Sequence, residues 1–144
     1  MMKLKKATTL ICILLAIASY HYFSNPQRTI TNYVKANQEQ LEEFVLTIIG
    51  SEVSEVDYSY NELQVSYWPE SETIEFITHT SGIVAASTYE GFYYSVNDTP
   101  QGFQGTKVNF IPKDNGLFWQ EPTGDNQAYI ENIVGNWYWF RYSF

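Results

Sequence analysis

Hydrophobic and polar residues follow three different patterns along the chain, and each pattern predicts a different kind of element. Residues 7–18 (ATTLICILLAIA) form an uncharged apolar run. Apolar residues then recur with a spacing of about 3.6 over residues 29–49, which predicts an amphipathic helix. Beyond Val53, apolar and polar residues alternate in short segments separated by turn sequences, which predicts β-strands.

The N-terminal segment, residues 1–23, has the pattern of a signal peptide or a signal anchor. Three lysines precede the apolar run, and the sequence AIA at 16–18 fits a small-x-small site for cleavage after Ala18. Without cleavage, residues 7–23 form an uncharged stretch of 17 residues. That length is just sufficient to cross about 30 Å of hydrocarbon. Both alternatives keep the lysines in the cytoplasm, so the domain is predicted to be tethered outside as a single-pass protein, or secreted.

The amphipathic helix is predicted to begin at a cap formed by Thr29 or Thr31 and to end at Gly50. The polar sequence NQEQ at residues 37–40 weakens its apolar stripe in the middle. We expect the stripe to pack on the domain's own sheet. A helix that binds a partner or lies beside the membrane is the alternative.

The strand predictions depend on alternation and on the turn sequences between segments. Residues 137–144 are the strongest candidate, because large aromatic residues at the even positions alternate with Trp137, Trp139, Arg141 and Ser143. Residues 127–134 fit either a strand or one to two helical turns. The remaining candidate strands are residues 53–58, 63–68, 73–80, 87–96, 106–111 and 116–120.

One helix followed by five to seven antiparallel strands predicts an α+β fold, with the helix packed on one face of a curved sheet. Residues 24–28 (SNPQR) are predicted to be a short linker, and residues 29–144 a single extracytoplasmic domain. The half-barrels of cystatin-like and NTF2-like proteins are the nearest analogy for this architecture. The analogy concerns shape and implies no function.

Charge and the small number of ligand-type residues exclude several classes of function. From Ser24 onward, five basic and sixteen acidic residues give a formal charge of −11. Such a body repels phosphate backbones, which argues against a nucleic-acid partner and favours basic partners. The single cysteine, Cys12, lies in the apolar run, so the exported part contains no disulfide and no cysteine-based zinc site. We therefore expect neither a metal nor a cofactor.

His79 is the only histidine beyond the N-terminal segment and so the only candidate of its type for a general base. A small hydrolase would use it with Ser81, Ser87 or Ser95 as nucleophile and a carboxylate to orient the ring. The chain has no GxSxG sequence. We expect His79 to be a surface residue and no catalysis, with a hydrolase as the alternative.

Acidic and amide side chains gather in the turn sequences at residues 97–99, 113–116 and 124–126. Their oxygens suit calcium, but their spacing lacks the alternation of an EF-hand loop, and turn formation explains their composition. Glu70 with Glu72, or Glu72 with Glu75, suggests a glycosidase pair, yet these acids follow a proline in a polar segment typical of a solvated turn. Calcium and carbohydrate are therefore not expected as ligands.

Aromatic residues form 17% of the chain and occupy both faces of at least two predicted strands. Such a sheet is either covered on both sides or exposes aromatic surface to a partner. Tyrosine rings that cover a core, with the hydroxyl in water, need no partner. If a partner surface exists, we expect it to contain Trp137, Trp139, Tyr93 and Trp119, because the first two lie opposite a row of aromatics that resembles core.

The motif GIVxxSTYxGFYYS at residues 82–95, with NWYWF at 136–140, resembles a group of small exported proteins of Gram-positive gut bacteria. The resemblance covers residues 63–144. No activity is established for the group, so the resemblance implies export and no chemistry. We expect a non-catalytic domain that binds another envelope or secreted protein, with a purely structural envelope protein as a further alternative.

Overall fold

The computed structural model describes residues 25–51, 57–83 and 86–144. Two helices, α2 (Pro26–Ala36) and α3 (Gln38–Ile49), precede the strands in this part of the chain. The strands and the short 3₁₀ helix η1 are β1 (Asp57–Tyr60), β2 (Leu63–Trp68), β3 (Thr73–Ile83), β4 (Ala86–Ser95), η1 (Phe103–Gly105), β5 (Ile111–Lys113), β6 (Gly116–Gln120), β7 (Gln127–Val134) and β8 (Trp137–Ser143).

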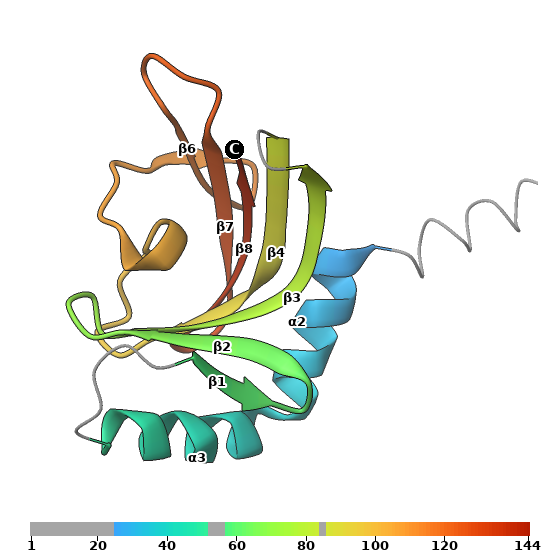
Figure 1. Ribbon diagram of the computed structural model, residues 1–144, viewed down its shortest axis with the longest axis vertical. Helices are drawn as coiled ribbons and strands as arrows, with labels where there is room; N and C mark the ends of the chain where they lie inside the picture. The colour runs from blue at the N-terminus through green and yellow to red at the C-terminus, as the bar shows by residue number, and fades with distance from the viewer. Residues whose placement is uncertain (1–24, 52–56, 84–85) are drawn as a thin grey trace, which may run out of the picture.

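All eight strands form one antiparallel sheet in the order β1-β2-β3-β4-β8-β7-β6-β5. The last strand, β8, therefore lies beside β4 at the centre of the sheet and joins its two halves. The long strands β3 and β4 bend strongly along their length (Figure 1). The structure agrees with an α+β fold built on a curved antiparallel sheet, with eight strands where five to seven were expected.

The predicted amphipathic helix is in fact two helices that meet at Asn37. The backbone of Asn37 leaves the helical conformation, with φ −120° and ψ 19°, and its side-chain amide donates a hydrogen bond of 2.8 Å to the carbonyl of Tyr33. The break falls where the apolar stripe is weakest. The predicted cap is also wrong, because Asn25 caps α2 by accepting from the Arg28 amide at 3.2 Å. Residues 26–28, predicted to belong to a linker, therefore form the start of α2. Gly50 follows α3 as expected.

Residues 106–111 were predicted to be a strand, but residues 106–110 belong to no strand and β5 begins only at Ile111. Their alternation has another cause, because Val108 and Phe110 are half-buried, Phe110 against the core of the sheet, while their neighbours are exposed. One-sided packing of a loop therefore imitates the pattern of a strand. The ambiguous segment 127–134 is a strand, β7.

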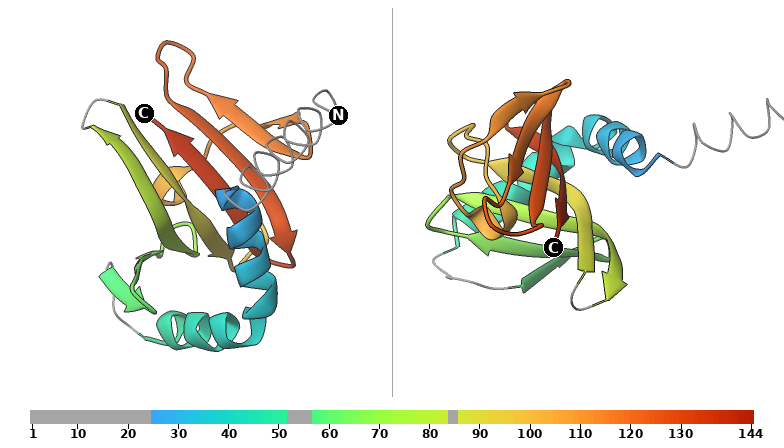
Figure 2. Two further views of the ribbon diagram at one scale, coloured as in Figure 1. Left: turned by 90° about the vertical axis from the view of Figure 1, so that its right-hand side faces the viewer. Right: turned by 90° about the horizontal axis from the view of Figure 1, so that it is seen from above.

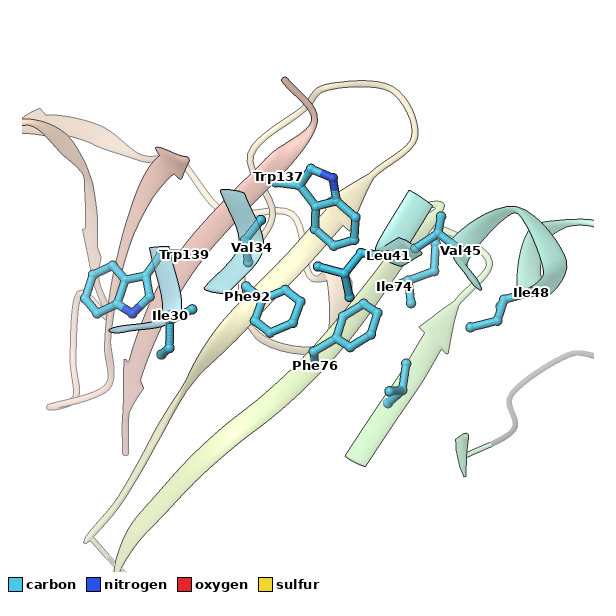
Figure 3. Close-up of a cluster of buried hydrophobic side chains, with 11 residues drawn as sticks. Ile30, Val34, Leu41, Val45, Ile48, Ile74, Phe76, Phe92, Trp137 and Trp139 are labelled. Carbon is cyan, nitrogen blue, oxygen red and sulfur yellow. The ribbon is translucent and has the colours of Figure 1, made fainter. Parts of the chain in front are cut away.

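The helices pack their apolar stripes on one face of the sheet, as expected. Phe76 from β3 and Phe92 from β4 stack beneath them, with ring centres 4.6 Å apart and planes 11° from parallel. Figure 3 shows side chains from α2 and α3 directed at this pair. The buried members of this helix-side core are Ile30, Val34, Leu41, Val45, Ile48, Val65, Ile74, Phe76, Phe92, Trp137 and Trp139.

The opposite face of the sheet carries a second core, which the segment between β4 and β5 covers. Figures 1 and 2 show η1, part of that segment, on the side of the strands away from the helices. We call residues 97–106 the strap. The sheet is therefore covered on both faces. The buried members of this strap-side core are Tyr93, Ala128, Ile130, Tyr138, Phe140 and Tyr142.

No helix of the described part of the chain is both long and apolar enough to cross a membrane. The predicted hydrophobic helix and signal segment, residues 1–23, lie outside the described residues.

The helix-side core predicts a large cost for Phe92→Ala, because Phe92 is fully buried and stacked on Phe76. We expect the free energy of unfolding, measured by urea titration followed by circular dichroism, to fall by about 3–5 kcal/mol. Leu46→Ala is the control, since Leu46 is 66% exposed on α3, and it should change stability by less than about 0.5 kcal/mol. Equal effects of the two substitutions would contradict this packing.

Candidate functional site

The structure buries three of the four aromatic residues expected to form a partner surface. Trp137, Trp139 and Tyr93 are 0%, 4% and 0% exposed. The two tryptophans belong to the core beneath the helices, and Tyr93 lies under the strap, where its hydroxyl accepts a hydrogen bond of 3.1 Å from the Gln101 amide. The prediction of an exposed surface built on these three residues is wrong, because both faces of the central strands are already covered.

Trp119, the fourth residue of that set, is half-buried on β6. It lines a small hollow of about 150 Å³ together with Phe103 of the strap and with Tyr142 and Phe144 at the end of the chain. Trp119 is therefore the one member of the predicted set that lines a surface hollow.

His79 lies exposed on β3, beyond the buried part of that strand. The residue opposite it on β4 is Glu90, which is buried. Of the three serines considered as its nucleophile, Ser81 is exposed on the same strand, Ser87 is half-buried, and Ser95 is buried at the other end of β4. The structure thus places Ser95 far along the sheet from His79.

An open cleft of about 300 Å³ lies between α2 and the β2–β3 side of the sheet. Ile30, which is 6% exposed, closes it from α2, and the half-buried Tyr33 and Leu63 add further apolar surface. Hydroxyl and amide groups accompany them at the exposed edge. The complete lining is Thr29, Ile30, Tyr33, Asn61, Leu63 and Thr78.

The turn between β1 and β2 fixes one side of this cleft. Tyr60 pairs with Leu63, so the hairpin loop contains only Asn61 and Glu62. Both adopt left-handed backbone angles, with φ 48° and 70°, which is the geometry of a type I′ turn. Asparagine tolerates this conformation well. The tight turn therefore holds Asn61 in place opposite α2.

Acidic and phenolic groups lie near the β1–β2 turn, which contributes Asn61 to the cleft. Burial raises the pKa of Tyr60, and neighbouring Tyr33 and Glu43 raise it further. Glu62 is exposed in the adjacent turn. The cleft thus combines an apolar lining with negative charge nearby, which suits an apolar side chain that has basic neighbours.

A second notable region lies under the strap, where polar groups of the sheet hold the covering segment. Tyr142 donates to the Gln101 carbonyl at 3.2 Å, and Tyr138 donates to the Asp98 carboxylate at 2.7 Å. The Ser95 hydroxyl donates to the Thr99 carbonyl and accepts from the Thr99 amide, both at 2.9 Å. Side chains of β4 and β8 therefore anchor the strap by hydrogen bonds to its backbone and to Asp98.

Glu75 is the most deeply buried carboxyl of this region, at 3% exposed. It accepts a hydrogen bond of 3.2 Å from the backbone amide of Gln104 in the strap. Burial raises the pKa of Glu75 to about 7, and the bond from Gln104 opposes part of that shift. Burial also raises the pKa of Tyr93 and of Tyr142, and both values are raised further by Glu75. A titratable carboxyl is thus enclosed among tyrosines.

Gln101 adds an unsatisfied acceptor to the same region. The residue is 5% exposed, and its side-chain oxygen has no hydrogen-bond partner among the described residues. A buried acceptor without a donor costs free energy. The Gln101 side-chain oxygen is therefore one acceptor of this region that no described donor satisfies.

A groove of about 500 Å³ separates the far end of the strap from the β2–β3 turn. Trp68 and Ser71 line it from the turn, and Gln104 and Lys107 from the strap side. At the point of closest approach the strap has Gly105, with φ 69°, and a Cβ there would lie 2.0 Å from the Ser71 hydroxyl oxygen. Only glycine allows this approach.

The sequence analysis considered Glu75 only as a member of a glycosidase pair in a solvated turn, and the structure shows instead that it is buried. The available signal was its position between Ile74 and Phe76 in an alternating strand, but alternation alone assigns such a residue to a solvent-facing side. Glu70 and Glu72, the other carboxylates of this region, are exposed.

Within the described ranges, no group of three or more His, Cys, Asp or Glu side chains is placed to hold a metal ion. Comparison of the chain with protein-family models, with curated proteins and with solved structures finds no match.

The buried carboxyl predicts a stability that depends on pH. The pKa of Glu75 in the folded protein is about 7, above its ordinary value of 4.5, so its contribution to folding is fully present below pH 4.5 and is lost as pH rises through 7. Glu75→Gln stays neutral. We expect the free energy of unfolding of the variant, measured relative to that of the wild type, to be roughly 3 kcal/mol higher at pH 8.5 than at pH 4.5.

Urea unfolding of both proteins at the two pH values measures this difference. Glu70→Gln, which removes an exposed carboxylate five residues earlier, is the matched control and should show no such gain. A difference between Glu75→Gln and the wild type that does not change with pH would refute the expected titration.

Proposed function

We propose that this protein is a non-catalytic extracytoplasmic domain that binds another envelope or secreted protein. Residues 7–23 tether it to the membrane, or cleavage after Ala18 releases it. The observation that carries the proposal is the apolar cleft between α2 and the sheet. Its lining presents Ile30, Tyr33 and Leu63 at an opening to solvent.

The cleft differs from the other exposed apolar groups of the described structure. Leu46, Ile83 and Ile111 are the exposed large hydrophobic residues there, and they lie on separate elements. Single exposed apolar side chains are normal on a protein surface. A hollow that combines several apolar side chains with hydroxyl and amide groups fits the insertion of an anchoring side chain from a partner.

The negative charge of the domain favours a basic partner. The chain from Ser24 onward has a formal charge of −11. Glu62 follows the cleft residue Asn61 in the β1–β2 turn, and Glu43 of α3 lies near Tyr60 at the start of that turn. An apolar side chain flanked by lysine or arginine matches both features. The partner segment is therefore proposed to be basic around one apolar anchor.

The position of the cleft along the chain also supports this proposal. The residues that α2 contributes to the cleft, Thr29, Ile30 and Tyr33, lie in its first turns, a few residues after the proposed membrane segment at 7–23. In the tethered form, the cleft therefore lies close to the membrane surface. A membrane-proximal segment of an envelope protein can reach it there.

Thr29→Trp tests the cleft, because a large ring at its exposed edge should occupy the space of the anchoring side chain. A partner is first recovered by pull-down from detergent-solubilised envelope with the wild-type protein and identified by mass spectrometry. We expect Thr29→Trp to weaken the affinity of the purified partner at least about tenfold in isothermal titration calorimetry.

Thr47→Trp is the matched control, since Thr47 is an exposed threonine on α3 and does not line the cleft. It should bind like the wild type, and raising the salt concentration should weaken binding of both. Equal affinities of the two tryptophan variants, or an affinity that does not change with salt concentration, would show that the cleft is not the proposed binding site.

The proposed location has a separate test. Asp125 is exposed in the segment between β6 and β7, so Asp125→Cys should react with a membrane-impermeant maleimide on intact cells. The wild type, whose only cysteine is Cys12, is the control and should not react. Labelling of Asp125→Cys only after the cells are permeabilised would show that the domain lies in the cytoplasm.

A further inference from the structure

We propose that the strap is a pH-sensitive cover, docked on the sheet when a proton is bound to Glu75 and released when that proton is lost. This inference concerns the face of the sheet opposite the cleft and does not depend on the proposed partner.

The geometry makes the strap, and not the sheet, the movable side of this contact. Glu75 belongs to β3, which is hydrogen-bonded to β2 on one side and to β4 on the other. The strap touches Glu75 through the backbone amide of Gln104, whose own φ of 55° is left-handed. A non-glycine residue in that conformation is under strain, which the docked contacts must offset.

None of the residues paired with Glu75 across the sheet carries a positive charge. Ser66 of β2 and Tyr93 of β4 are its partners across the sheet, and Tyr142 of β8 is the other titratable group that faces it. From the strap, Gln104 supplies one backbone donor. The Asp98 carboxylate accepts from Tyr138.

The nearest basic residue in sequence to the strap is Lys107, which is exposed immediately after it. Its charge is therefore in solvent, outside the enclosed region. An ionised Glu75 would accept one backbone hydrogen bond from the strap and would have no buried cation among these neighbours, which is a costly environment for a carboxylate.

Protonation of Glu75 removes its charge and adds one hydrogen-bond donor under the strap. A neutral carboxyl group carries one O–H donor, whereas the carboxylate only accepts. The region already contains the buried Gln101 oxygen without a partner. The raised pKa of Glu75 agrees with a docked strap that favours the protonated carboxyl. If docking raises the pKa of an acid, binding of the proton in turn stabilises the docked state.

Release of the strap would expose a defined surface. The strap covers Tyr93 and Tyr142, whose hydroxyls contact Gln101, and its Phe103 packs on Tyr142 with ring centres 5.3 Å apart. At acidic pH this tyrosine-rich face is closed. Above neutral pH it becomes accessible to solvent, so the proposed device couples external pH to the exposure of one face of the domain.

Hydrogen exchange of the full-length protein tests the proposal at pH 5.5 and 8.5, after correction for the intrinsic effect of pH on exchange. The Gln101 and Gln104 amides are hydrogen-bonded to Tyr93 and Glu75 in the docked strap. We expect their protection to fall at least about tenfold at the higher pH. Peptides from β8 should keep their protection, since the sheet stays intact.

Glu75→Gln should hold the strap docked at both pH values, whereas Glu70→Gln should behave like the wild type. Tyr142→Phe, which removes the donor to the Gln101 carbonyl, should lower strap protection at both pH values. The ¹³C shift of the Glu75 carboxyl carbon in the wild type supplies a measurement that needs no variant. Its titration should share a midpoint with the loss of strap protection.

Strap protection in the wild type that does not change between the two pH values would overturn the proposal. So would a loss of protection that persists in Glu75→Gln, or a Glu75 midpoint that differs from that of the strap. Loss of protection in β8 together with the strap would show global unfolding in place of local release.

Discussion

The central pair of strands has large apolar side chains on both of its faces, and this one constraint organises the rest of the structure. Phe92 and Tyr93 are neighbours on β4, and Trp139 and Phe140 are neighbours on β8, yet all four are buried. A sheet of this kind cannot leave either face in water, because exposure of that much apolar surface is unfavourable. One face therefore requires the helices, and the other requires the strap.

The helices and the strap each cover one apolar face of the sheet, but different interactions hold them there. The helices bury a continuous apolar stripe against Phe76 and Phe92, so that side is held by packing. The strap is a short segment with little apolar surface of its own, and tyrosine hydroxyls from β4 and β8 bind its backbone. A cover held by polar groups brings polar groups into the core. Glu75 and the unsatisfied Gln101 oxygen are consequences of that arrangement.

Local patterns in the sequence predict those elements that local interactions determine. The bounds of β2 at 63–68 and β6 at 116–120 follow from alternation and flanking turns, and Gly50 ends α3 as expected. The packing of the helices and of the strap on the sheet depends on contacts between distant segments. Local sequence patterns could not predict those contacts. Trp137 and Trp139 were assigned to a partner surface because nothing local shows that α2 packs over them, and the strand predicted at 106–111 is a packed loop.

The position of β8 has a consequence for how the chain reaches its fold. Strands β1–β4 and β5–β7 are made first, but they touch through β8, which pairs with β4 on one side and with β7 on the other. Until that strand exists, each half presents an unpaired central edge and the two cannot close into one sheet. Closure of the complete sheet therefore requires β8, the one strand that pairs with both halves.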